Sequence, residues 1–126
     1  MSKVLYLPLK KEWYEMIESG VKTEEYREIK PYWSKRLTHF TYGEYETLEE
    51  LTSQLQFAEE DGWTPYEVLR YYGAQLRRFD VVKFSYGYTK RTMTFECKGI
   101  TIGEGKAEWG APDEDVFIIK LGERIE

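Results

Sequence analysis

The feature that most constrains the fold is a change in hydrophobic period at Asp80. From there on, apolar and polar side chains alternate, which is typical of strands with one buried face. The alternating apolar positions are Val82, Phe84, Tyr86, Tyr88, Met93, Phe95 and Cys97. The apolar phase then switches from odd to even positions at Lys98-Gly99, before Ile100 and Ile102. This switch predicts a β-bulge that bends the strand, and a bent strand suits a small barrel.

The N-terminal third predicts a strand, a helix and a second strand. The run 4–7 is apolar and stops at Pro8, which favours a buried strand. Over 10–19 the apolar side chains fall on one helical face, and Gly20 is placed to end that helix. The segment 22–29 ends before Pro31 and predicts a strand, and the apolar run 116–121 predicts a closing strand.

An acidic insertion separates these two parts. Residues 43–65 hold seven acidic and no basic side chains. Thr47 with Glu50, and Thr64 with Glu67, match helix-start signals, so we expect helices over about 48–60 and 65–78. The sequence thus predicts one α+β domain over 1–126: a small mixed or antiparallel barrel with a helix after its first strand and a helical insertion at about 43–79. The insertion's carboxylates either form solvated helix faces or bind a basic protein partner.

Composition excludes several classes of function. A chain of 126 residues is the length of one domain, and its net charge of −5 argues against binding duplex DNA. A single His and a single Cys leave too few ligands for a zinc site, so we expect neither a metal nor a cofactor. No apolar run approaches the roughly 18 residues that cross a bilayer. We therefore expect a cytoplasmic protein without membrane contact.

Lys22, Glu25 and Arg27 are the strongest candidates for chemistry. On a strand Glu25 and Arg27 share one face, whereas Lys22 lies at the preceding turn and can swing to either face. Beside carboxylates the Lys stays a cation that binds a phosphate or polarises a carbonyl. Glu25 would then be the general base and Lys22 the oxyanion donor. The alternative is a surface ladder of ion pairs.

The motif Gly20-x-Lys22-x-x-Glu25-x-Arg27 resembles the signature of the ASCH domain, a branch of the PUA-like β-barrel superfamily. Pro31-Tyr32-Trp33 and the run 103–110 are similar to uncharacterised bacterial and phage members. The resemblance implies a PUA-like barrel with RNA or a modified nucleoside bound in a cleft. The motif, with Gly20 and Arg27, would line this cleft. We also expect ligand contacts from Arg91 and from Tyr26, Trp33 and Trp109, whose rings can stack on a base.

The same resemblance leaves the activity open. Some small ASCH proteins remove the acetyl group from acetylated cytidine with a Lys, a Thr and a Glu. Lys22 matches the Lys, the Thr position holds Glu25 with Thr23 nearby, and the Glu is Glu96 or Glu108. Other ASCH proteins are similar to ribonucleases or to RNA-binding modules. An amidohydrolase or ribonuclease, a non-catalytic RNA or nucleotide reader, and a protein-interaction accessory module are the alternatives.

Overall fold

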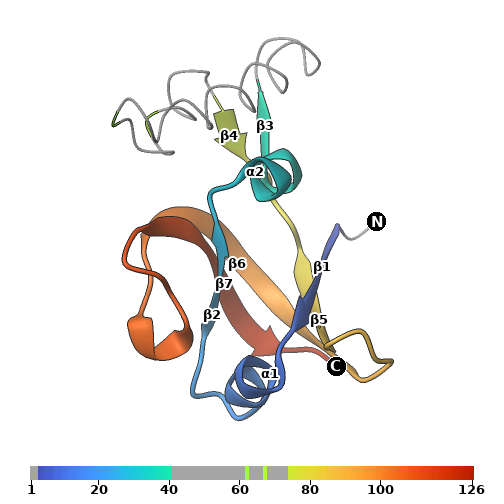
Figure 1. Ribbon diagram of the computed structural model, residues 1–126. Coiled ribbons are helices and arrows are strands. Elements are labelled where there is room, and N and C mark those ends of the chain that lie inside the picture. The colour runs from blue at the N-terminus through green and yellow to red at the C-terminus, as the bar shows by residue number, and fades with distance from the viewer. Residues whose placement is uncertain (1–2, 41–61, 63–66, 68–73) are drawn as a thin grey trace. The chain divides into compact units, whose positions relative to one another are not determined.

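The computed structural model describes residues 3–40, 62, 67 and 74–126 (Figure 1). The chain divides into two compact units, one of 1–26 with 78–126 and one of 27–77. The elements, in chain order, are β1 (Val4–Leu9), α1 (Lys11–Glu18), β2 (Glu24–Glu28), α2 (Pro31–Leu37), β3 (Thr38–Phe40), β4 (Ala74–Leu76), β5 (Val81–Tyr86), β6 (Thr92–Glu104), the 3₁₀ turn η1 (Ala107–Trp109) and β7 (Asp115–Arg124). The α+β class is confirmed.

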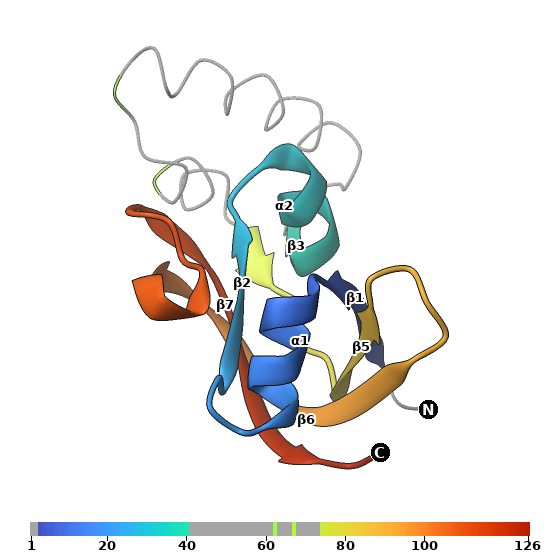
Figure 2. The ribbon, with the colours of Figure 1, turned by 60° about the horizontal axis from the view of Figure 1, so that its bottom comes forward.

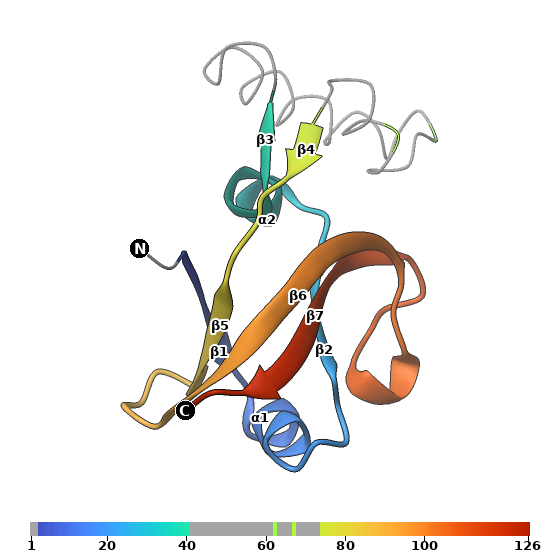
Figure 3. The same cartoon turned by 180° about the vertical axis from the view of Figure 1, so that it is seen from behind.

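The main sheet has five strands in the order β1-β5-β6-β7-β2. Strand β1 runs parallel to β5, with Val4 opposite Val81 and Leu9 opposite Tyr86, whereas β5 with β6 and β6 with β7 are antiparallel. The sheet is mixed, as expected. Figure 3 shows the long strands β6 and β7 curling together, which gives the sheet the curvature of a half-barrel.

The bulge predicted at Lys98-Gly99 is confirmed. The pairing of β6 with β7 shifts register between Phe95 and Cys97 and again between Cys97 and Gly99. Gly99 has φ of +140°, a backbone conformation that residues with a side chain rarely adopt. The core-facing positions are consequently odd up to Phe95 and even from Ile100, and the strand bends around the core.

Helix α1 packs on the main sheet through its apolar stripe. It lies across the curve of the sheet between β2 and β1 (Figure 2). Tyr14 and Ile17 are buried, while Trp13 and Met16 are half-buried. They meet a core supplied mainly by β1, β5, β6 and β7: Leu5, Leu7, Leu9, Val82, Phe84, Met93, Phe95 and Val116 to Ile119.

The predicted strand alternation is wrong at Tyr88. The strand ends at Tyr86, and Tyr88 lies in the tight turn between β5 and β6 with 97% of its surface exposed. Gly87, with φ of +58°, starts a turn although the apolar alternation in the sequence continues to Tyr88. Tyr88 is therefore not a core residue.

The second unit contains α2 and the antiparallel pair β3 and β4. Proline at the first position of α2 explains why a helix begins where the sequence had only suggested the end of a strand. The expected helix over 65–78 is wrong at its end, because 74–76 form strand β4 opposite Thr38 to Phe40. Glu67 is helical, and residues 43–61, 63–66 and 68–73 of the predicted insertion lie outside the described residues. In the described parts of the chain no helix is long and apolar enough to cross a membrane.

Candidate functional site around Lys22

Lys22 is placed by the turn that ends α1. Gly20 has φ of +84°, and its N–H donates to the carbonyl of Ile17 at 3.1 Å. The N–H of Lys22 then donates to the carbonyl of Met16 at 3.0 Å. Gly20 thus has the turning role predicted for the end of the helix, and Lys22 is held next to α1 with only 2% of its surface exposed.

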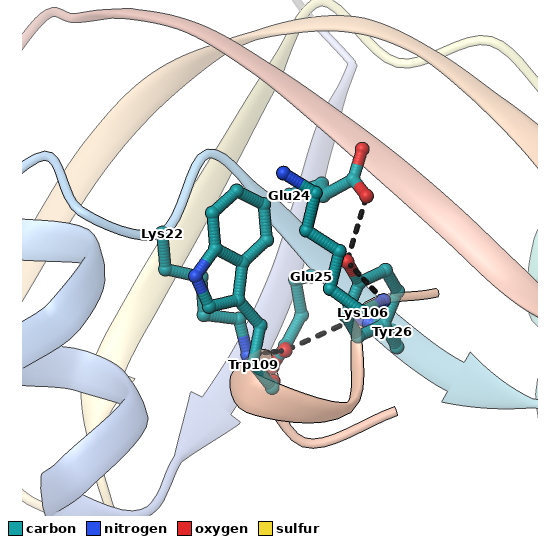
Figure 4. A network of polar contacts seen from close by, with 6 residues as sticks. All are labelled: Lys22, Glu24, Glu25, Tyr26, Lys106 and Trp109. Atoms are coloured by element: carbon teal, nitrogen blue, oxygen red, sulfur yellow. Dashed lines mark hydrogen bonds and ion pairs between the residues drawn. The ribbon is translucent and has the colours of Figure 1, made fainter. Parts of the chain in front are cut away.

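The Lys22 amine makes two hydrogen bonds inside the fold and lies near two aromatic rings, those of Trp13 and Tyr26. Nζ donates to Oε1 of Glu25 at 2.8 Å and to the main-chain carbonyl of Trp109 at 2.7 Å (Figure 4). The ring centroid of Trp13 lies 4.6 Å from the same nitrogen, within the range of a cation–π interaction. Lys22 swings toward Glu25, one of the two orientations left open by the sequence.

Glu25 is also held by the backbone. Its Oε1 accepts the N–H of Tyr26 at 3.1 Å in addition to the Lys22 amine, and Glu25 is 4% exposed. A buried ion pair gives up much hydration, which its Coulomb attraction offsets only when further hydrogen bonds complete the geometry. Here the Trp109 carbonyl and the Tyr26 N–H are those bonds. The pair is therefore a fixed, desolvated group that already binds a carbonyl oxygen.

A second short network fixes Tyr26 beside this pair. The Tyr26 hydroxyl donates to Oε1 of Glu24 at 2.7 Å and accepts the N–H of Lys106 at 3.0 Å (Figure 4). Burial raises the pKa of Tyr26, and its hydrogen bond to the Glu24 carboxylate raises the pKa further. The hydroxyl therefore stays protonated as a donor at neutral pH.

The loop that contains Trp109 packs too closely for larger residues. A Cβ at Gly105 would lie 2.6 Å from Cβ of Ala111 and 2.7 Å from the Tyr26 ring. Gly110 has φ of +94°, and a Cβ there would lie 2.8 Å from the Trp13 ring. These two glycines allow the β6–β7 loop to bring the Trp109 carbonyl onto Lys22.

The remaining predicted catalytic residues are placed differently. Thr23, Glu108 and Glu96 are exposed, whereas Lys22 and Glu25 are buried. Thr23 instead accepts the N–H of Leu121 through its backbone carbonyl at 3.1 Å. The structure thus brings Lys22, Glu25, Tyr26 and Trp109 together without those three side chains.

Three predicted ligand-binding residues belong to other clusters. Arg91 donates to both oxygens of Glu18, at 3.0 and 3.2 Å, and this hydrogen bond raises the pKa of the Arg91 guanidinium. Arg27 stacks over Trp33 within the second unit, with its guanidinium carbon 5.0 Å from the ring centroid.

Sequence reasoning missed Trp13, Glu24 and Lys106 as members of this site. Trp13 lies on the apolar face predicted for the helix over 10–19, and its ring also lies against the Lys22 amine. Glu24 and Tyr26 are two residues apart on β2, so the period-two rule could have predicted their contact. The Nζ of Lys106 lies 4.2 Å from the Trp109 ring centroid, a contact for which the sequence carries no signal.

Two further findings concern possible metal ligands and the comparison with known proteins. Among the residues that the structure describes, no group of three or more His, Cys, Asp or Glu side chains could hold a metal ion. No family model, curated protein or solved structure matches this chain.

Proposed function

We propose that this chain is an ASCH-like domain of PUA-like architecture that binds a modified nucleoside or an unpaired base of RNA. The residues that would bind it are Lys22 and Glu25, with Tyr26 and Trp109 beside them. The proposal includes the cytoplasmic location and rests on the motif described above and on one structural observation. That observation is the hydrogen bond from the buried Lys22 amine to the Trp109 carbonyl.

The contact with Trp109 supports a carbonyl-bearing ligand. A lysine amine that donates to a main-chain carbonyl can donate equally to the carbonyl of a pyrimidine base or of its acetyl group. Binding would replace the Trp109 carbonyl on Lys22 while the Glu25 ion pair stays in place. The Trp13 and Tyr26 rings near the amine supply faces on which a base can stack.

The geometry favours binding without turnover over hydrolysis. Oε1 of Glu25 already accepts two hydrogen bonds, from Lys22 and from the Tyr26 N–H. An oxygen that already accepts two hydrogen bonds is less available to take a proton from water. Thr23, the candidate nucleophile, is exposed. We therefore favour the reader over the amidohydrolase or ribonuclease.

The test is a panel of acetylated cytidine, cytidine and a single-stranded uridylate octamer, each incubated with the protein. Chromatography detects product, and calorimetry detects binding. We expect binding of at least one nucleoside without release of cytidine from the acetylated form. Turnover that Thr23→Val abolishes would establish the hydrolase instead, and absence of binding to the whole panel would refute the proposal.

A further inference from the structure

A groove lies on the face of β1, β5 and β6 that points away from the core. On β1, Leu5 and Leu7 face the core and are buried. Tyr6 and Pro8, which alternate with them, lie on the opposite face and are exposed. The groove has a volume of about 180 Å³. Its lining includes side chains from all three strands and from the turn between β5 and β6: Tyr6, Pro8, Lys83, Ser85, Tyr88 and Thr92.

Strand register builds the floor of this groove. Tyr6 lies opposite Lys83 in the parallel pair, and Pro8 lies opposite Ser85, which in turn lies opposite Thr92. Residues directly opposite one another in paired strands present their side chains on the same face. An aromatic ring, an amine and two hydroxyls are thus fixed side by side.

The turn that carries Tyr88 is held by short hydrogen bonds. The Ser85 hydroxyl donates to the carbonyl of Gly87 at 2.6 Å, and the Thr89 hydroxyl donates to the carbonyl of Tyr86 at 2.6 Å. The N–H of Gly87 also donates to the carbonyl of Leu9 at 2.8 Å. Tyr88, at 97% exposure, is therefore displayed on an ordered turn, and an ordered backbone lowers the entropy lost on binding.

Charge indicates which ligand fits this groove. Lys83 is the single charged residue in the lining, and no carboxylate accompanies it. Lys83 is half-buried, and within the described part of the chain its amine has no hydrogen-bond or ion-pair partner. In a chain of net charge −5, such a position is complementary to an anion. The flanking tyrosines, Tyr6 at 68% and Tyr88 at 97% exposure, add faces for a planar ring.

We propose that this groove is a second binding site, which takes one nucleotide with its base against Tyr6 and Tyr88 and its phosphate on the Lys83 amine. The volume of about 180 Å³ is below the roughly 300–1,000 Å³ of enclosed ligand sites, so the groove would hold the nucleotide only in part and leave the remainder in solvent. The nucleotide is either free or part of a single strand of RNA. This site does not depend on the function proposed for Lys22, since none of its residues takes part in that cluster.

The experiment is a titration of the ¹⁵N-labelled protein with cytidine 5′-monophosphate, followed by amide chemical shifts. We expect the shifts to cluster at Tyr6, Lys83 and Tyr88. Lys83→Gln should weaken binding of the monophosphate about tenfold and binding of cytidine much less, because only the monophosphate carries the anion. Tyr88→Ala should weaken both about tenfold through lost stacking.

Controls separate the alternatives. Lys120→Gln, on an exposed lysine of β7, should leave binding unchanged. Tighter binding of a uridylate octamer than of the monophosphate would identify RNA as the source of the nucleotide, and equal affinity would identify free nucleotide. Shifts confined to Lys22 and Trp109, or groove shifts produced only by a proline-rich peptide, would overturn the second site. The first of these results would leave the proposed function standing.

Discussion

The Lys22 amine and the Trp109 carbonyl oxygen form a 2.7 Å hydrogen bond although the two residues are 87 positions apart in the chain. This bond joins the turn after α1 to the loop between β6 and β7. Together with the hydrogen bond from the Lys106 N–H to the Tyr26 hydroxyl, it holds the loop against β2.

Removing one member of the Lys22–Glu25 pair should destabilise the fold strongly. We expect Lys22→Met to lower the free energy of unfolding by about 3 kcal/mol, because Glu25 would remain buried without its cation. Lys22→Met combined with Glu25→Gln should cost less than the sum of the single changes. Denaturant unfolding of both singles and the double variant measures this coupling. A loss below about 0.5 kcal/mol for Lys22→Met, similar to that of the exposed Lys11→Met, would show that the pair is hydrated in solution.

Two glycines near the end of β6 provide a matched test of the loop packing. A Cβ at Gly105 would lie 2.6 Å from Ala111, whereas a Cβ at Gly103 would meet only Ile118 at 3.6 Å, an ordinary contact. Gly105→Ala should therefore lower stability by about 1–3 kcal/mol through overpacking, and Gly103→Ala should be nearly neutral. Thermal unfolding compares the two variants. Equal melting temperatures would mean that the loop does not pack on Tyr26 as described.

Replacing each of two buried tyrosines with phenylalanine should change the free energy of unfolding differently. Tyr26→Phe removes the partner of both Glu24 and the Lys106 N–H and should cost about 1–2 kcal/mol. The Tyr14 hydroxyl is buried and has no hydrogen-bond partner among the described residues, so Tyr14→Phe should be neutral or stabilising. Unfolding in urea distinguishes the two. A destabilising Tyr14→Phe would reveal a bond to that hydroxyl in solution.

The single thiol should be unreactive at neutral pH. Burial raises the pKa of Cys97 above its ordinary value, so the protonated form is favoured in the folded state. The contribution of the protonated Cys97 thiol to the free energy of unfolding is fully present below the pKa of the unfolded thiol. It is lost as pH rises through the pKa of the folded thiol. Alkylation rates from pH 7 to 10 should follow a profile displaced to higher pH than that of an unfolded cysteine peptide. A profile that coincides with the peptide's would contradict the raised pKa.

Local patterns predicted the strands around the bulge well. The phase switch at Lys98-Gly99 is a local property of the sequence, because a bulge moves every later side chain to the other face of the strand. The helix over 10–19 likewise followed from its apolar stripe and from Gly20. The turn at Gly87 was missed because the apolar alternation continues through it to Tyr88.

The candidate site could be predicted only in part. Spacing placed Lys22 beside Glu25 but left its direction open, since a side chain at a turn has no fixed face. The direction is set by the Trp109 carbonyl and the Trp13 ring, which come from distant or unrelated positions in the sequence. The parallel pairing of β1 with β5, from which the groove at Lys83 arises, is also a long-range contact.

The Lys22 amine itself gives the most direct test of the proposed function. A buried, hydrogen-bonded ammonium exchanges its protons slowly enough to be followed by ¹⁵N NMR at Nζ in the wild-type protein. On titration with acetylated cytidine or cytidine, we expect the Lys22 Nζ signal to shift together with the Trp109 amide and indole signals, as the ligand carbonyl replaces that of Trp109. A Lys22 signal that stays unchanged at saturating ligand, while other residues respond, would contradict the assignment of this cluster as the nucleoside site.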